Sequence, residues 1–136
     1  MRQHLSILFL LFVFTSCSSN KELKLSAGRC ISEYNTKYTS LSTKGSEEQW
    51  KANTEIRPGD STNDVLSQKA QEAFAAFTGK KDIVDSARYF LDNKKAFTDL
   101  QVRQLNMILY QAGNNPEIAK DLVKQRIKQL LPIKNS

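Results

Sequence analysis

Histidine is nearly missing from this chain of 136 residues, since His4 is the only one. Zinc hydrolases rely on imidazole ligands, and nucleophilic triads usually rely on an imidazole base. His4 stands in a segment that we predict to be removed, so neither kind of site can be assembled from the rest. The sequence also lacks H-E-x-x-H, Cys-x-x-Cys, an EF-hand loop and the glycine-rich loops that hold phosphates. We therefore expect no catalytic residue, no metal ligand and no cofactor in this chain.

Strand signals are missing as well. No segment alternates polar and apolar residues on either side of an Asn-Gly or Asp-Gly turn. Cysteine is scarce, with two in the chain, and once Cys17 is processed the single thiol of Cys30 cannot form an internal disulfide. Cys30 is either a reactive thiol or an ordinary residue of the first helix, and the second interpretation is the simpler one.

The amino-terminal residues have the pattern of a removable export signal. Arg2 and His4 precede an apolar run from Leu5 to Phe14, which Ser6 alone interrupts. The run is too short to cross a bilayer as a helix, which takes roughly 20 apolar residues. A charged start, a short apolar stretch and small residues before a cut site are typical of a signal peptide, which we place at residues 1–16.

Cys17 follows this segment directly, and the small residues Thr15 and Ser16 come before it. This order is typical of bacterial lipoproteins, whose acylated cysteine holds the protein to a membrane. We predict lipidation of Cys17 and a location in the cell envelope, on the periplasmic or surface side of a bacterial membrane. The alternative is an ordinary secretory cut near the same place, which would leave Cys17 as a plain thiol.

The residues after the cysteine predict a flexible tether at 17–27, followed by a helical segment at 28–136. The tether is small and polar and includes Lys21, Glu22 and Lys24. The chain has a formal net charge of +6, which can indicate anionic partners. No aromatic residues interleave with the basic ones, so we expect no nucleic acid. Solvated faces explain the basic residues more simply.

The segment after the tether has helical periodicity. Ile31, Tyr34, Tyr38 and Leu41 recur at spacings of three and four and predict a first helix. The sequence Arg-Pro-Gly-Asp at 57–60 ends it. The two tyrosines are better explained as core residues than as a ligand platform. Trp50 falls on a different face and suggests a second packing partner.

Further helices follow by the same criteria. The second has Leu66, Ala70, Ala73, Phe74 and Phe77 on one face and ends at Gly79, and the third, at about 82–91, has Ile83, Ala87, Phe90 and Leu91. A capping box of Thr98 and Gln101 begins the fourth, with Leu105, Ile108, Leu109 and Ala112, and Gly113 ends it. Asn115 and Pro116 begin the fifth, with Ile118, Leu122, Val123, Ile127, Leu130 and Leu131. We predict an all-α fold of four to five amphipathic helices after a lipoprotein signal peptide.

Charged groups outside this pattern are weak candidates for chemistry. Glu47 and Glu48 point in different directions on a helix, which is a poor arrangement for an acid/base pair. Asp82 and Asp85 lie near a helix N-terminus, where negative charge is favourable in any case. Four basic residues wind around the last helix as a solvated face: Lys120, Lys124, Arg126 and Lys128.

Scattered residues of the chain resemble a known family. Tyr34-Asn35, Tyr38, Glu48, Trp50, Asn53-Thr54 and Ile56 look like the first long helix of the angiotensin-converting-enzyme-like zinc peptidyl-dipeptidases, in particular of their bacterial relatives. The sequences Leu-Gln-Val-Arg-Gln-Leu at 100–105 and Ala-Gly-Asn-Asn-Pro at 112–116 are similar to bacterial members as well. The resemblance extends over about Ile31 to Arg126.

This resemblance implies a helical metallopeptidase that binds zinc through H-E-x-x-H and a distant Glu. Such enzymes remove dipeptides from peptide C-termini, and their N-terminal helices form a lid over the substrate channel. This chain corresponds to that N-terminal part alone and ends before the zinc motif. No catalytic residue of the family carries over to any position here, and the zinc of the complete members would belong to the missing catalytic body.

Two hypotheses follow for the function. In the first, the chain is the lipid-anchored, lid-forming part of a zinc peptidyl-dipeptidase, catalytically silent alone, and its partner is the missing catalytic body. In the second, it is an autonomous helical envelope lipoprotein that acts as a protein-binding module. An autonomous module should unfold cooperatively, whereas a separated lid should be marginally stable and expose apolar surface.

Overall fold

Helix α2 (Thr15–Thr54) is the longest element of the computed structural model, which describes residues 15–130 and their side chains from residue 20 onward. With 40 residues and a rise of 1.5 Å per residue, it is about 60 Å long. The predicted signal peptide lies outside the described residues except for its last two. Cys17 falls in the first turn of α2, and its side chain lies outside the described part.

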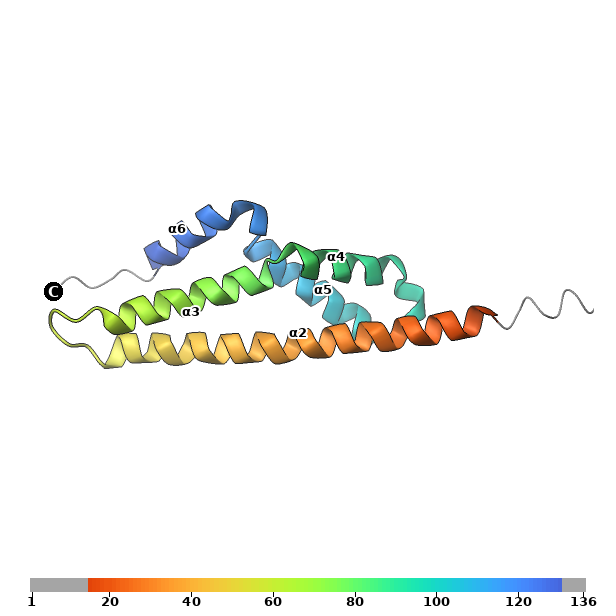
Figure 1. Ribbon diagram of the computed structural model, residues 1–136, viewed down its shortest axis with the longest axis horizontal. Helices are drawn as coiled ribbons and strands as arrows, with labels where there is room; N and C mark the ends of the chain where they lie inside the picture. Colours follow the sequence, from red (N-terminus) through yellow and green to blue (C-terminus); the bar gives the residue numbers. More distant parts are fainter. Residues whose placement is uncertain (1–14, 131–136) are drawn as a thin grey trace, which may run out of the picture.

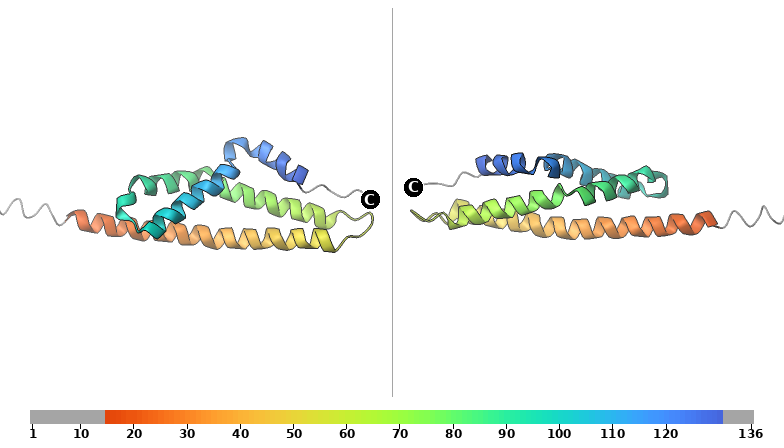
Figure 2. Two further views of the ribbon diagram at one scale, coloured as in Figure 1. Left: turned by 180° about the vertical axis from the view of Figure 1, so that it is seen from behind. Right: turned by 45° about the horizontal axis from the view of Figure 1, so that its top comes forward.

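Helix α3 (Thr62–Thr78) runs back antiparallel along α2, and the two form a long hairpin (Figures 1 and 2). The turn between them contains the predicted break at 57–60. Gly59 has a φ of 77°, a left-handed conformation that glycine adopts without steric cost. Asp60 Oδ1 accepts a hydrogen bond of 2.9 Å from the backbone N–H of Thr62 and satisfies one free donor of the next helix.

The remaining helices lie over one side of this hairpin (Figure 1). They are α4 (Lys81–Asp92), α5 (Asp99–Asn114) and α6 (Lys120–Leu130), with 3-10 turns at η1 (Lys94–Ala96) and η2 (Glu117–Ala119). Helix α5 packs against α4 and α2, and α6 packs against α3. The described residues are therefore all-α, as predicted.

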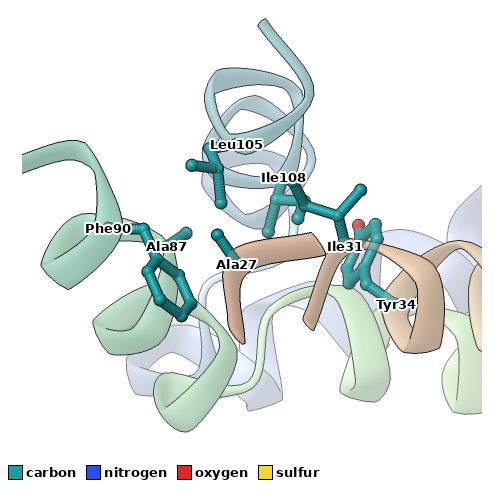
Figure 3. Close-up of a cluster of buried hydrophobic side chains, with 7 residues drawn as sticks. All are labelled: Ala27, Ile31, Tyr34, Ala87, Phe90, Leu105 and Ile108. Carbon is teal, nitrogen blue, oxygen red and sulfur yellow. The ribbon is translucent and has the colours of Figure 1, made fainter. Parts of the chain in front are cut away.

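The main core lies where α2, α4 and α5 meet (Figure 3). It contains seven buried side chains: Ala27, Ile31 and Tyr34 from α2, Ala87 and Phe90 from α4, and Leu105 and Ile108 from α5. Most of these positions belong to the apolar faces that the periodicity predicts. A smaller cluster of Ala75, Val123 and Ile127 joins α3 to α6.

Residues 17–27 differ from the expected flexible tether, because they are part of α2. Ala27 is fully buried, and Leu23 packs against the main core. Gln101 Nε2 also donates a hydrogen bond of 3.3 Å to the carbonyl oxygen of Lys24. These contacts with α4 and α5 stabilise the helical conformation of this polar segment. Local composition does not reveal them.

The capping box that begins α5 is confirmed. The backbone N–H of Gln101 donates to Thr98 Oγ1 at 3.3 Å, and the N–H of Thr98 donates to Gln101 Oε1 at 3.1 Å. Each residue thus satisfies a backbone donor of the other, and the first turn of the helix is stabilised. Helix α5 then continues one residue past Gly113, which was expected to end it.

The predicted start of the fifth helix at Asn115 is wrong. Asn115 follows the last residue of α5, and α6 begins at Lys120 after the turn η2. The side chain of Asn115 is occupied elsewhere: its Nδ2 donates to Thr78 Oγ1 at 2.9 Å, and its Oδ1 accepts from Arg126 Nη2 at 2.7 Å. Asn115 therefore caps the C-terminus of α5, where its backbone N–H donates to the carbonyl oxygen of Ala112 at 3.1 Å, and its side chain joins α3 to α6.

The apolar face predicted for the fifth helix is confirmed only in part. Val123 and Ile127 are buried against α3, whereas Leu122 and Leu130 are exposed and Ile118 is 98% exposed. The wrong helix start explains Ile118, because a 3-10 turn before α6 changes its direction relative to the helix. Leu131 lies outside the described residues.

Candidate binding groove between helices α2 and α5

An open groove with a volume of about 470 Å³ lies between α2 and α5. Its walls are Tyr34, Asn35 and Tyr38 from α2, and Leu100, Arg103, Gln104, Met107, Ile108 and Gln111 from α5. The volume is within the range of ligand sites in proteins, which are mostly apolar with a few polar groups. The groove, named here the α2–α5 groove, has that composition.

Helix α2 supplies the groove with aromatic rings that α3 holds in place from behind. The ring of Tyr34 stacks on Tyr38 and on Phe77, with centroid distances of 5.8 and 5.3 Å. Tyr38 meets Phe74 edge to face at 5.2 Å. Offset and edge-to-face contacts of this kind each add about 1 kcal/mol to burial. This wall is therefore preformed. Tyr34 is buried in the main core as predicted, whereas Tyr38 is half-buried against that core, and both residues also line the groove.

The hydroxyl group of Tyr34 is the most unusual polar group of the groove. Tyr34 is 8% exposed, and its hydroxyl oxygen is buried without a hydrogen-bond partner in the described structure. Figure 3 shows the hydroxyl end of the ring turned toward α5. Burial and, secondly, the neighbouring Tyr38 raise the pKa of Tyr34 to about 12. The group is therefore a protonated O–H at neutral pH.

Helix α5 supplies the exposed wall. Leu100 and Met107 are 59% and 55% exposed, although both are large and apolar. Arg103 lies between them on the same side of the helix and also lines the groove. The ion pairs in the described structure all join other residues, so Arg103 forms none with a described carboxylate. No aspartate or glutamate lines the groove either.

The candidates weighed from the sequence lie elsewhere and have structural partners. Lys51 pairs with Glu48 at 3.5 Å, Lys80 pairs with Asp82 at 3.0 Å, and Lys81 pairs with Asp85. Arg126, expected to be solvated, also donates from Nη1 to the carbonyl oxygen of Asn114 at 2.9 Å. Lys81 and Asp85 also line a second cavity, of about 620 Å³, together with Arg88 and Glu117.

Cys30 does not have the properties of a reactive thiol. It is half-buried beside the main core, and burial, followed by the charge of Glu33, raises its pKa. Reactive cysteines have a lowered pKa and stand in positive surroundings. The interpretation of Cys30 as an ordinary helix residue is therefore the better one.

Among the described side chains, from residue 20 to residue 130, no three of His, Cys, Asp or Glu come together as metal ligands would. None of the described helices has the length and apolarity needed to cross a membrane.

No protein-family model, no curated protein and no solved structure matches the chain.

The exposed wall of this groove has a signal in the sequence, which is the helical spacing of its residues. Leu100, Arg103 and Met107 are spaced by three and four, so they share one face of α5. The buried face of the same helix contains Leu105 and Ile108. A helix with two apolar stripes predicts neighbours on both sides, and in the described structure α2 and α4 cover the stripe of Leu105 and Ile108 while Leu100 and Met107 stay exposed.

Proposed function

We propose that this protein is a lipid-anchored helical module of a bacterial cell envelope that binds a partner protein. The observation that carries this proposal is the α2–α5 groove, whose exposed apolar wall adjoins a rigid aromatic wall. Binding sites typically combine an apolar body with a few polar groups in this way. The partner is the protein that covers Leu100 and Met107.

The core supports an autonomous module. Leu105 and Ala27 are fully buried, and Ala87 is almost fully buried in the same cluster. Residues of this chain alone bury these side chains. A lid separated from its body would be expected to leave its core positions exposed. Helices α2, α4 and α5 instead cover one another, so they can fold without a second chain.

The continuity of α2 supports a role for the anchor. If Cys17 is acylated, Tyr34 lies about 25 Å further along the same helix. A headgroup layer is only about 5–8 Å thick, since a bilayer of about 40–45 Å contains a hydrocarbon core of about 30 Å. A helix that stands away from the membrane would hold the groove beyond the lipid, where it can meet another protein.

The anchor is tested by labelling cells with an alkyne fatty acid and isolating the membrane fraction. The native chain should carry label and remain with the membrane, and Cys17→Ser should lose both. Cys30→Ser is the matched control and should behave like the native chain. Label that persists in Cys17→Ser, or a native chain without label, would overturn the lipid anchor.

Partner binding is tested on membranes solubilised in mild detergent, by the native mass of the complex. Leu100→Asp combined with Met107→Asp should reduce the complex to the single chain, while circular dichroism shows unchanged helix content. Tyr110→Asp on the same helix is the control, because Tyr110 is 65% exposed and does not line the groove. A native chain that already runs as a single copy would contradict the proposal.

A second candidate is the lid of a zinc peptidyl-dipeptidase. It is favoured by the uncovered end of the hairpin, where Trp50, Ile56 and Leu66 are exposed. Trp50 and Ile56 are also among the residues that resemble this family. An antibody against residues 31–125 separates the candidates on a denaturing gel of the membrane fraction. A band near 15.4 kDa, less the signal and plus lipid, favours the module, and a band several times larger favours the lid.

A further inference from the structure

The exposed wall of the α2–α5 groove has the spacing of a helix-binding surface. Leu100, Arg103 and Met107 follow one another along α5 at intervals of three and four residues, and Gln111 continues the row. Amphipathic helices that lie in grooves present their anchors at the same intervals. A helix laid along this row would meet one α5 side chain per turn.

The openness of the groove favours a helix over a small molecule. Small-ligand sites bury most of their ligand, whereas here both apolar side chains of the outer wall are more than half exposed. Methionine suits such a surface because its unbranched side chain adapts to different partners. The aromatic wall of Tyr34 and Tyr38 forms the fixed side of the same groove.

Charge defines the partner more closely. Arg103 is the one charged residue of the lining, and no described carboxylate pairs with it. A guanidinium group surrounded by apolar and amide side chains favours a carboxylate, which it can bind through two parallel hydrogen bonds. The buried Tyr34 hydroxyl, which has no hydrogen-bond partner in the described structure, belongs to a residue of the opposite wall.

From these observations we infer that the α2–α5 groove binds an amphipathic helix of a partner protein, whose apolar face covers Leu100 and Met107 and whose carboxylate pairs with Arg103. This inference rests on the proposed function and names the chemistry of its partner. The acidic residue lies among the residues of the partner's apolar face, because Arg103 stands between the two apolar residues of the wall.

The test is photocrosslinking of the full chain in its native membrane. p-Benzoylphenylalanine is placed at Met107 in the groove and, as controls, at Tyr110 and Leu122, which are exposed outside it. Mass spectrometry then identifies the partner peptide joined to each position. Met107 should crosslink to a peptide with apolar residues at helical spacing and an Asp or Glu among them.

Charge exchange then tests the role of Arg103. Arg103→Glu should lower the crosslink yield at Met107 by about tenfold, and exchanging the partner's acid for Lys should restore it. Arg88→Glu on helix α4 is the control and should leave the yield unchanged, because Arg88 does not line this groove.

Each alternative result overturns a stated part. A crosslink at Met107 to a second copy of this chain, to lipid, or to a peptide without an acidic residue overturns the inference. A crosslink yield at Met107 that is unchanged in Arg103→Glu overturns it as well. Protein crosslinks at Tyr110 or Leu122 but not at Met107 leave the proposed function standing and refute the groove as its site. No protein crosslink at any of the three positions refutes both.

Discussion

The two halves of helix α2 have different environments, although they belong to one continuous helix. In the first half, Ala27, Ile31 and Tyr34 are buried in one cluster with side chains of α4 and α5, and the end of α3 reaches Tyr34 through Phe77. The second half lies against α3 alone, and its large apolar residue Trp50 is 69% exposed (Figure 1). The number of covering helices, more than the local sequence, therefore decides where this helix has a core.

This difference predicts uneven stability along the molecule. Segments with few buried apolar contacts open locally at lower free energy than the segments that form the core. Near the hairpin end, the buried residues of α3 are small, namely Ser67 and Ala70. The end with α4 and α5 should account for most of the free energy of unfolding.

The largest expected effect comes from emptying the main core. Leu105 is fully buried between α2 and α4, so Leu105→Ala should lower the free energy of unfolding by about 4 kcal/mol. Leu100→Ala is the matched control on the same helix and should change it by less than about 1 kcal/mol, because Leu100 already faces solvent. Urea titrations followed by circular dichroism measure both. Equal losses would show that Leu100 is covered in solution.

A second prediction concerns the junction that joins α3 and α4 to α5 and α6. A Cβ added at Gly79 would lie 1.4 Å from the carbonyl oxygen of Asn115, so the two turns would have to separate. Gly79→Ala should therefore lower the free energy of unfolding by about 3 kcal/mol. Gly113→Ala is the control, because nothing lies within 4 Å of its added Cβ. A neutral Gly79→Ala would contradict this close approach of the turns.

The helices were largely predictable from the sequence, because each has strong local signals. The capping box of Thr98 and Gln101 and the break at 57–60 depend on neighbouring residues only, and both are confirmed. The buried positions Ile31, Phe90 and Leu105 follow from periodicity for the same reason.

The parts that were not predicted depend on contacts between distant segments. Asn115 has the local sequence of a helix N-cap, but its side chain forms hydrogen bonds with two distant residues. Thr78 lies 37 residues earlier, and Arg126 lies on the next helix. The segment 17–27 likewise contacts distant residues, since Ala27 is buried with α4 and α5 and Gln101 donates to the carbonyl oxygen of Lys24. The α2–α5 groove needs the relative placement of two helices, which periodicity within each helix does not contain.

A third prediction uses the pH dependence of stability. The folded protein holds the pKa of Tyr34 at about 12, above the ordinary value of about 10. The folded state therefore retains a proton that the unfolded state loses, and the contribution of Tyr34 is present below pH 10 and lost as the pH rises through 12. At neutral pH, Tyr34→Phe should be as stable as the native chain or slightly more stable, because the removed hydroxyl has no partner.

The urea midpoints of the native chain and of Tyr34→Phe should therefore diverge between pH 9 and pH 11.5, with the native chain falling further. Tyr110→Phe is the control at an exposed tyrosine and should follow the native chain at each pH. If the urea midpoints of the native chain and of Tyr34→Phe change in parallel with pH, water reaches the Tyr34 hydroxyl. The first half of α2 would then be less buried than its contacts with α4 and α5 indicate.

The smallest expected effect is at the hairpin end. Trp50 is the only tryptophan, so fluorescence reports this end alone. Because Trp50 is mostly exposed, acrylamide should quench it nearly as well in the folded chain as in urea, and Trp50→Phe should change the free energy of unfolding by less than about 0.5 kcal/mol. Amide hydrogens around 44–54 should also exchange faster than those around 23–34. Trp50 fluorescence protected from acrylamide, or a loss of about 2 kcal/mol in the free energy of unfolding of Trp50→Phe, would show that a second copy or another protein covers this end. The difference between the two halves of α2 would then hold for the isolated chain only.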